Sequence, residues 1–223
     1  MRDFLATLLF GGSCFVCRGA SPEPLCEACR EELPRLGEEL CPRCALPCPG
    51  GAVCGRCLAE PPAYDATIAA FAYDFPADTL VHALKFRGEL ALAPLLGRLL
   101  SACIPSWSVD RVIPVPLSSA RLRSRGYNQA VEIGKHLARG KLDVDVCLRR
   151  GESVPQTELP WEERRRNVRG AFGCRRALAG ATVAVVDDVM TTGATLDELA
   201  LTLKRAGAAR VVNWVVARTL PPA

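Results

Sequence analysis

The 223-residue sequence has no apolar run that approaches the roughly 20 residues needed to span a membrane. A short apolar stretch, Phe4 to Phe10, lies before Cys14 and faintly resembles a lipoprotein signal. Asp3, however, stands where such a signal is basic, and Gly11 stands where a branched aliphatic residue is needed. We therefore expect a protein without a membrane span that is located in the cytoplasm.

The first quarter of the chain also has few large apolar side chains, so it cannot bury much of a core. It has instead four C-x-x-C pairs before residue 60, with proline and glycine between them. A C-x-x-C turn directs two thiolates at one ion, and four thiolates complete a tetrahedral zinc shell that supplies folding energy. The pairs predict one or two structural zinc sites, with the ligands Cys14, Cys17, Cys26, Cys29, Cys41, Cys44, Cys54 and Cys57.

The chemistry and the pairing of these cysteines have alternatives. Disulfides would need an oxidising compartment, so zinc in the cytoplasm is favoured. Sequential and interleaved arrangements both use all four pairs, and Cys48 adds a further thiol near the second set. The other cysteines stand alone among apolar or strand-like residues, and we expect small core side chains at Cys103, Cys147 and Cys174.

A stiff linker, Glu60-Pro61-Pro62-Ala63, separates a double zinc ribbon-like module at residues 1–60 from an α/β domain at residues 64–223. Strands and helices alternate in the second part, which predicts a mostly parallel sheet with helices on both faces. The expected strands are Thr67 to Tyr73, Asp110 to Val115, Val144 to Leu148, Thr182 to Val186 and Arg210 to Ala217. The expected helices are Ala77 to Phe86, Leu90 to Cys103, Gly126 to Arg139, and one that ends near Gly207.

The most informative segment is the run from Val185 to Glu198. An apolar strand ends in two adjacent acids, Asp187 and Asp188, and a short Thr/Gly turn leads into a helix. Thr195 and Glu198 have the S/T-x-x-E spacing of a capping box, so we expect the helix to begin there. Unpaired backbone amides at the helix start and in the turn form a site for a phosphate group. Carboxylates beside such a site suit a ligand that carries hydroxyls or a metal, as a sugar phosphate does.

This order of strand, paired acids, T-T-G-x-T turn and helix resembles the signature by which type I phosphoribosyltransferases bind phosphoribosyl pyrophosphate. The resemblance assigns the catalytic acids Asp187 and Asp188 to the ribose hydroxyls, and it implies Mg²⁺ on the pyrophosphate. It places the 5-phosphate on the turn, so the residues expected to bind phosphoribosyl pyrophosphate are Val189, Met190, Thr191, Thr192, Gly193, Ala194 and Thr195. Asp197 is interpreted as an ordinary acid of the first helical turn.

Positive charge is concentrated in the middle of the chain. Residues 118–176 contain fourteen Lys/Arg against seven Asp/Glu, a local balance of +7, whereas the whole chain has a net charge of +4. Aromatic residues beside clustered cations are typical of single-stranded nucleic acid binding, and a solvated basic surface explains the pattern equally well. The nucleic-acid candidates are Arg123, Tyr127, Trp161, Arg164, Arg165, Arg166 and Arg169.

Beyond the acidic motif, the chain resembles the ComF family of competence proteins, which join a cysteine cluster to a phosphoribosyltransferase domain similar to amidophosphoribosyltransferase-like proteins. The likeness runs almost end to end, through A-L-K-F-R-G at residues 83–88, V-I-P-V-P-L at 112–117, R-L-R-S-R-G-Y-N-Q-A at 121–130 and E-R-R-R-N-V-R-G-A-F at 163–172. It implies a role in DNA uptake or in the use of imported DNA. The implied partners are single-stranded DNA and the DNA-uptake helicase machinery.

The same resemblance gives roles to other residues. Arg121 and Arg125 are expected to contact the pyrophosphate from the loop after a strand, and Arg164 to Arg169 take the place of a mobile loop that closes on substrate. Lys85 is either a phosphate contact or a cation that complements the dipole at a helix end. His82 is expected to be a half-buried helix residue.

No motif that reads a nucleobase is visible, and the chain ends soon after its last strand, so the acceptor of a transfer reaction stays undefined. Whether the domain is an active phosphoribosyltransferase is therefore left open. Two hypotheses remain. The first is a DNA-uptake protein that uses phosphoribosyl pyrophosphate as ligand or substrate. The second is an ordinary nucleobase phosphoribosyltransferase of nucleotide salvage with an added zinc module.

Overall fold

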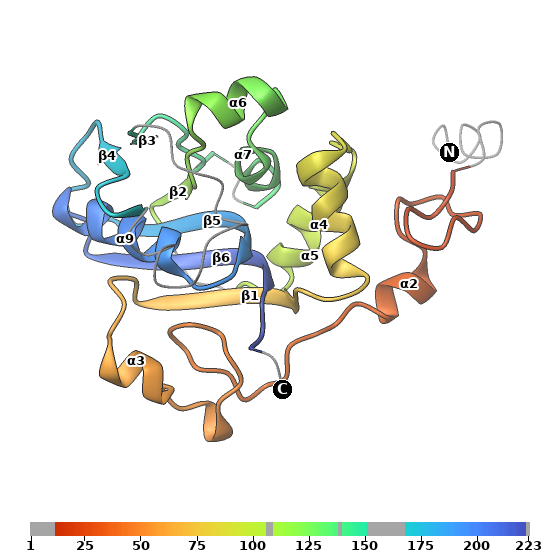
Figure 1. Ribbon diagram of the computed structural model, residues 1–223, viewed down its shortest axis with the longest axis horizontal. Coiled ribbons are helices and arrows are strands. Elements are labelled where there is room, and N and C mark those ends of the chain that lie inside the picture. The colour runs from red at the N-terminus through yellow and green to blue at the C-terminus, as the bar shows by residue number, and fades with distance from the viewer. Residues whose placement is uncertain (1–11, 106–108, 138–139, 151–167, 222–223) are drawn as a thin grey trace.

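The centre of the protein is a four-stranded parallel sheet with the strand order β1-β6-β5-β2 (Figure 1). The computed structural model describes residues 12–105, 109–137, 140–150 and 168–221. Parallel neighbours cannot be joined by tight turns, so each strand is followed by a longer connection. The strands of the sheet are β1 (Ala66–Ala72), β2 (Arg111–Pro114), β5 (Thr182–Met190) and β6 (Arg210–Arg218).

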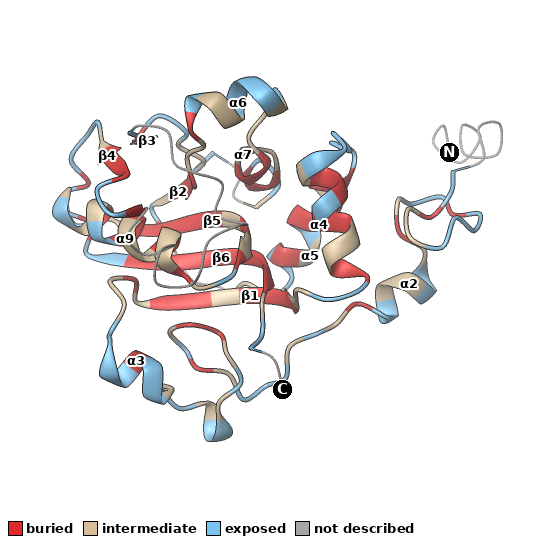
Figure 2. Ribbon diagram, in the orientation of Figure 1, coloured by how far each residue is buried: buried red, intermediate tan, exposed pale blue. Residues whose placement is uncertain are grey.

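The two central strands, β5 and β6, are largely buried, as Figure 2 shows in red. All of residues 211–218 in β6 are buried, and Val183 of β5 lies opposite Val211. Asn213 interrupts the apolar run, and its side-chain amide donates to the Thr67 hydroxyl on β1 at 3.1 Å. Such near-continuous apolar runs form strands that are covered on both faces.

Alternate residues of a strand point to opposite sides of the sheet, and here both sides are apolar. Helices therefore cover both faces of the sheet. Ala184 and Val186 of β5 share one core with three helices, whereas Val183 and Val185 share the other core with a fourth. The structure therefore confirms the predicted fold class. No helix in the described part of the chain is long and apolar enough to cross a membrane. The first face carries α4 (Ala77–Phe86), α5 (Leu92–Ser101) and α7 (Gln129–Gly134), and the second carries α9 (Ala194–Arg205).

The cysteine-rich segment folds into two small units that lie apart in Figure 1. The first unit contains α2 (Glu27–Glu31), and its Leu25 and Leu33 pack into the core of α4 and α5. The second contains the 3-10 turn η1 (Pro49–Gly51) and α3 (Gly55–Ala59), and it packs into the core of α9. Each unit thus supports a different face of the sheet.

A two-stranded antiparallel ribbon lies next to α9. It pairs β3 (Cys147–Arg149) with β4 (Phe172–Cys174), and the Sγ atoms of Cys147 and Cys174 are 3.3 Å apart. Cys103 is partly buried, and its thiol donates to the Leu99 carbonyl at 3.6 Å. All three lone cysteines are buried or partly buried, in agreement with the prediction.

The structure differs from the prediction between residues 118 and 137. The helix expected from residue 126 begins only at Gln129, as α7, and an additional helix, α6 (Ser119–Arg125), precedes it. Gly126 ends α6 in the left-handed conformation with φ of 82°, and the Asn128 side chain caps α7 by accepting from the amide of Ala130 at 2.9 Å. The arginines of this segment therefore lie on a helix instead of a loop.

Strand boundaries also differ. β5 continues to Met190 instead of ending at Val186, so Asp187 and Asp188 lie within the strand, and Asp187 is paired with Val215 of β6. The strand expected at residues 144–148 is shifted to β3, and β4 was not predicted. Short strands such as β3 and β4 depend on pairing with each other, which local sequence does not reveal.

Candidate functional site

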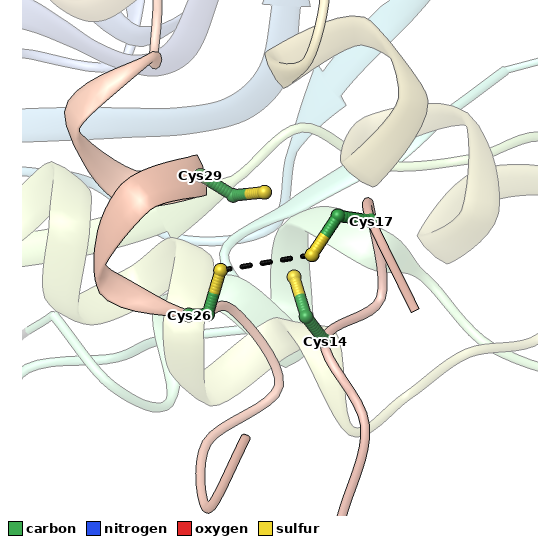
Figure 3. Close-up of side chains that lie close together, drawn as sticks. All are labelled: Cys14, Cys17, Cys26 and Cys29. Atoms are coloured by element: carbon green, nitrogen blue, oxygen red, sulfur yellow. Dashed lines mark hydrogen bonds between the residues drawn. The ribbon is translucent and has the colours of Figure 1, made fainter. Parts of the chain in front are cut away.

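Four cysteine side chains of the first unit point toward one another (Figure 3). The Sγ atoms of Cys14, Cys17, Cys26 and Cys29 all lie within 4.8 Å of one another, and those of Cys17 and Cys26 are 3.8 Å apart. The chain reverses just after Cys17, where Arg18 is left-handed with φ of 63°. Cys26 then stands at the N-cap position of α2.

The second unit repeats this arrangement. Cys41, Cys44, Cys54 and Cys57 also have Sγ atoms within 4.8 Å of one another, with 3.6 Å between those of Cys44 and Cys54. Ala45 is left-handed with φ of 56°, as Arg18 is in the first unit, and Cys54 stands at the N-cap position of α3. The two units are therefore copies of one design, in which a reversing knuckle faces the start of a short helix.

Both clusters fit a zinc ion. A Zn–S bond of about 2.3 Å places the sulfurs of a tetrahedral site about 3.8 Å apart, close to the 3.8 Å and 3.6 Å found here. Burial raises the pKa of Cys14 and Cys41, but hydrogen bonds from backbone amides lower it overall, to about 6 and about 7. These amides favour the thiolate that binds zinc. The pairs are used sequentially, and Cys48 belongs to neither cluster.

The two acids of the acidic motif lie near the carboxyl end of β5, where Lys85 reaches them from the end of α4. Nζ of Lys85 is 3.0 Å from Oδ2 of Asp188, whose side chain is 3% exposed. Burial lowers the pKa of Lys85, but the charges of Asp188 and Asp187 raise it above its ordinary value. Lys85 therefore stays charged as the ion-pair partner of Asp188.

Asp187 shares that single lysine with Asp188. Burial, together with the negative charge of Asp188, raises the pKa of Asp187 to about 8, although Lys85 opposes the shift. Two adjacent carboxylates that share Lys85 cannot both ionise easily in a desolvated site. Such a pair suits a ligand that brings a cation or hydroxyl donors, because either would stabilise the second negative charge.

The threonine loop, residues 191–193, connects β5 to α9. Gly193 is left-handed with φ of 84°, and a Cβ there would lie 2.7 Å from Cε of Met190, so the turn requires glycine. The capping box predicted for Thr195 and Glu198 is wrong, because the helix begins directly after Gly193, which is itself the N-cap. The carboxylate of Glu198 instead accepts from the amide of Gly170 at 2.9 Å.

A cavity of about 940 Å³ opens between α4, α6 and the carboxyl end of β5. It is lined by the acid pair, the threonine loop, the first residues of α9 and several cations. The phosphate donors expected from the sequence and the basic residues expected from the resemblance thus face one space. The predicted residues that line it are Lys85, Arg121, Arg125, Tyr127, Asp187, Asp188, Val189, Met190, Thr191, Thr192, Gly193, Ala194 and Thr195.

Other predicted residues lie elsewhere. Arg123 and Arg169 are exposed and do not line the cavity. His82 is exposed instead of half-buried, and its ring centroid is 4.7 Å from that of Phe86. Trp161 and the arginines at 164–166 lie outside the described residues, so their roles stay predictions.

The sequence did not predict several residues that line the cavity, among them a cation, an amide and an aromatic ring. Arg149 reaches the cavity from β3, Gln129 from the start of α7, and Phe86 from the end of α4. The high local content of cations was the only signal for Arg149. Burial and the charge of Arg121 lower the pKa of Arg149, so this wall of the cavity concentrates positive charge.

Asp197 also has a role that the sequence did not suggest. Its Oδ1 accepts a hydrogen bond of 2.6 Å from the amide of Ala63, which ties the linker to the first turn of α9. The side chain does lie in the first turn, as predicted, but it is engaged by another part of the chain. The linker and the second unit are thereby held directly behind the threonine loop.

The paired four-cysteine units and the parallel sheet define a zinc-ribbon α/β protein, and residues 5–58 match the family described as "Double zinc ribbon domain". The chain as a whole belongs to the ComF family of competence and DNA utilization proteins. It is 35% identical over 225 residues to "DNA utilization protein YhgH" of Salmonella typhi, covering 94% of this chain and 98% of that protein.

Two further relatives carry competence names. The chain is 30% identical over 227 residues to "Competence protein F" of Haemophilus influenzae, covering 94% of this chain and 98% of that protein. It is 26% identical over 208 residues to "Competence protein ComFC" of Bacillus subtilis, covering 86% of this chain and 82% of that protein. Family membership therefore extends over both the cysteine-rich units and the α/β domain.

Solved structures give a more distant likeness. The allosteric regulatory enzyme of purine biosynthesis matches 55% of this chain and 25% of its own at 23% identity and a TM-score of 0.37. A purine phosphoribosyltransferase from Pyrococcus horikoshii matches 69% of this chain and 87% of its own at 18% identity and a TM-score of 0.31. The fold assignment rests on the strand order and the helices on both faces of the sheet.

Proposed function

We propose that the protein binds phosphoribosyl pyrophosphate with Mg²⁺ in the cavity and single-stranded DNA on the adjoining basic and aromatic surface. Its role would be DNA uptake or the use of imported DNA. The observation that carries this proposal is the meeting of the acid pair, the threonine loop and a wall of cations in one cavity of about 940 Å³.

Each part of the ligand has a matching group in the cavity. Asp187 and Asp188 would accept hydrogen bonds from the ribose hydroxyls, and the amides of the threonine loop would bind the 5-phosphate. Arg121, Arg125 and Arg149 line the opposite wall and would bind the pyrophosphate as charge-assisted donors. Mg²⁺, when bound, would neutralise charge on the pyrophosphate oxygens.

The mouth of the cavity supports the DNA-binding part of the proposal. Phe86 is 57% exposed, and the guanidinium of Arg125 lies 5.4 Å from its ring centroid. Tyr127 lies beside them, with its hydroxyl donating to the carbonyl of Leu84. Exposed aromatic rings next to cations can stack bases while the cations bind phosphates. Arg123 and Arg169 are exposed and would add positive charge outside the cavity.

The biological role is proposed from the named relatives, which are called competence or DNA utilization proteins and match most of this chain. None of the twelve cysteines forms a disulfide, which suits the reducing environment of the cytoplasm. There the protein would meet incoming single strands, and the DNA-uptake helicase machinery is the partner that this role implies.

Calorimetric titration with phosphoribosyl pyrophosphate and Mg²⁺ tests the cavity assignment. Arg121 and Arg123 lie on the same helix, but only Arg121 lines the cavity. We expect Arg121→Ala to weaken binding about tenfold or more, because a hydrogen bond to a charged group is lost, and Arg123→Ala to leave it unchanged. Absence of binding to the wild-type protein, or equal losses in both variants, would contradict the proposal.

A pyrophosphate-release assay with nucleobases and single-stranded DNA separates the two functions considered from the sequence. Release that depends on a free base and disappears in Asp188→Asn would establish a nucleobase phosphoribosyltransferase of salvage instead. If the protein binds phosphoribosyl pyrophosphate but no pyrophosphate is released, the compound is a ligand of a DNA-handling protein and not a substrate. Weakening of single-strand binding with increasing salt is expected for contacts to phosphates.

A further inference from the structure

The second zinc unit lies directly behind the threonine loop and is hydrogen-bonded to it. Arg218 of β6 is 1% exposed, and its Nε donates to the carbonyl of Cys44 at 2.8 Å. Its Nη1 donates to the carbonyl of Met190 at 2.9 Å and also to that of Thr191. One buried guanidinium therefore joins the Cys41-x-x-Cys44 knuckle to the start of the loop.

The second cysteine pair of the same zinc site, at the start of α3, makes a separate link. Arg56 lies between Cys54 and Cys57, and its Nη2 donates to the carbonyl of Thr192 at 2.5 Å. The carbonyls of three consecutive residues, 190–192, thus all accept from Arg218 or Arg56, and that of Met190 also accepts from the amide of Thr219 at 3.0 Å. In the first unit, the ligand cysteines pack instead with α4 and α5, on the other face of the sheet.

The geometry of the peptide bond gives these contacts a consequence. In a planar trans peptide, the carbonyl and the amide of the next residue point in opposite directions. Holding the carbonyls of residues 190–192 toward the guanidinium groups of Arg218 and Arg56 therefore turns the amides of residues 191–193 away from those two groups. Thr191, Thr192 and Gly193 line the cavity, and we infer that their amides face a ligand there.

We propose that Arg218 and Arg56 are positioning residues through which the second zinc site orders the threonine loop for binding an anionic phosphate group. The identity of that group as phosphoribosyl pyrophosphate rests on the proposed function. Because coupling between two binding sites is reciprocal, zinc at the second site strengthens phosphate binding, and the bound phosphate strengthens the binding of that zinc. The first zinc site has no such coupling.

Hydrogen exchange of the ligand-free protein tests the positioning role directly. Peptides that cover residues 189–195 should exchange about tenfold faster in Arg56→Ala and in Cys54→Ser, which loses the second site. Arg43→Ala is the matched control. Arg43 lies between Cys41 and Cys44, and it makes no hydrogen bond to the described residues of the loop. Arg218→Lys keeps the positive charge but loses the several N–H donors of the guanidinium. Residues 189–195 should therefore exchange as fast in this variant as in Arg56→Ala.

Equilibrium competition for zinc with a chromogenic chelator tests the reciprocal effect. In the wild-type protein, phosphoribosyl pyrophosphate should protect one of the two ions by raising its binding affinity about tenfold. Cys26→Ser, which keeps only the second site, should retain this protection, whereas Cys54→Ser and Arg56→Ala should lose it.

The two assays distinguish the possible failures. Unchanged loop exchange in Arg56→Ala and Cys54→Ser, or equal protection of both zinc ions, would overturn the positioning role. Faster loop exchange in these variants, combined with no calorimetric binding of phosphoribosyl pyrophosphate to the wild-type protein, would support the positioning role and overturn the proposed function.

Discussion

At the scale of single residues, the acid pair has a charge imbalance that should be measurable. Lys85 lies 3.0 Å from Asp188, and Asp187 is left with a pKa of about 8 because of burial and the charge of its neighbour. A carboxyl group with a raised pKa binds a proton in the folded state that the unfolded chain has already released. Folding stability must therefore depend on pH through this residue.

Asp187→Asn tests that dependence. An unfolded Asp ionises near pH 3.9, so the wild-type protein should lose stability as pH rises from about 4 to about 8, and no further above that. The variant cannot ionise, and its melting temperature should exceed that of wild type by more at about pH 9 than at about pH 6. Asp145→Asn, at an exposed position, is the control. A difference that stays constant with pH would refute the shift.

Phe86→Leu tests the aromatic residue at the cavity mouth. Stacking of one base is worth about 1–3 kcal/mol, so affinity for single-stranded DNA should fall about tenfold, while Phe86→Tyr should retain it. Phe75→Leu is the control, because Phe75 is 63% exposed but does not line the cavity. Fluorescence anisotropy with a labelled oligonucleotide measures the effect. Equal behaviour of the two leucine variants would exclude stacking on Phe86.

At the scale of elements, the connection from β5 to α9 is the part that depends most on backbone conformation. Gly193 combines a left-handed φ of 84° with close neighbours, since a Cβ there would lie 2.7 Å from Met190 and 3.0 Å from the hydroxyl of Tyr64. Gly180 has a similar φ of 79° but open space around it. A substitution at Gly180 therefore tests backbone strain alone, whereas one at Gly193 adds the effect of close neighbouring atoms.

Gly193→Ala should therefore impair the protein more than Gly180→Ala, because it should lower ligand affinity as well as stability. Both substitutions place Cβ in the left-handed region, at a cost of about 1–2 kcal/mol in the free energy of unfolding. Only Gly193→Ala should also displace the threonine loop and weaken binding of phosphoribosyl pyrophosphate. Urea unfolding and calorimetry measure the two effects. Equal ligand affinity in both variants would show that the loop tolerates a side chain.

α6 illustrates why one element was missed from the sequence. It carries Arg121, Arg123 and Arg125 but has no buried residue, and its Leu122 is 46% exposed. A helix without an apolar face has no periodic signal. Its ends are set by local chemistry. The Ser118 side chain accepts a hydrogen bond at the start, and Gly126 ends the helix in the left-handed conformation.

At the scale of the whole molecule, the two zinc units are attached to opposite faces of one sheet. Cys14 shares a core with α4 and α5, whereas Cys41, Cys44 and Cys57 share a core with α9. A small unit with few apolar residues gains its stability from the metal and from the larger domain on which it packs. Loss of either zinc should therefore loosen a different side of the α/β domain.

Cys54→Ser and Cys48→Ser test this arrangement. Native mass spectrometry should find about one zinc ion in Cys54→Ser and two in Cys48→Ser, because Cys48 lies outside both clusters. The melting temperature should fall clearly in Cys54→Ser only, because a structural zinc contributes folding free energy. Loss of a zinc ion in Cys48→Ser would show that the second site uses a different set of ligands.

The sequence by itself determined the cysteine pairs, the central strands and the acidic motif, because each has a local pattern of spacing or apolar residues. The tertiary structure decided which cysteine pairs share a site, that Lys85 pairs with Asp188, and that Arg149 and Phe86 reach the same cavity as the threonine loop. It also placed Arg218 between the second zinc site and that loop. These contacts join residues that are far apart in the chain, and only the packing of the sheet, helices and zinc units brings them together.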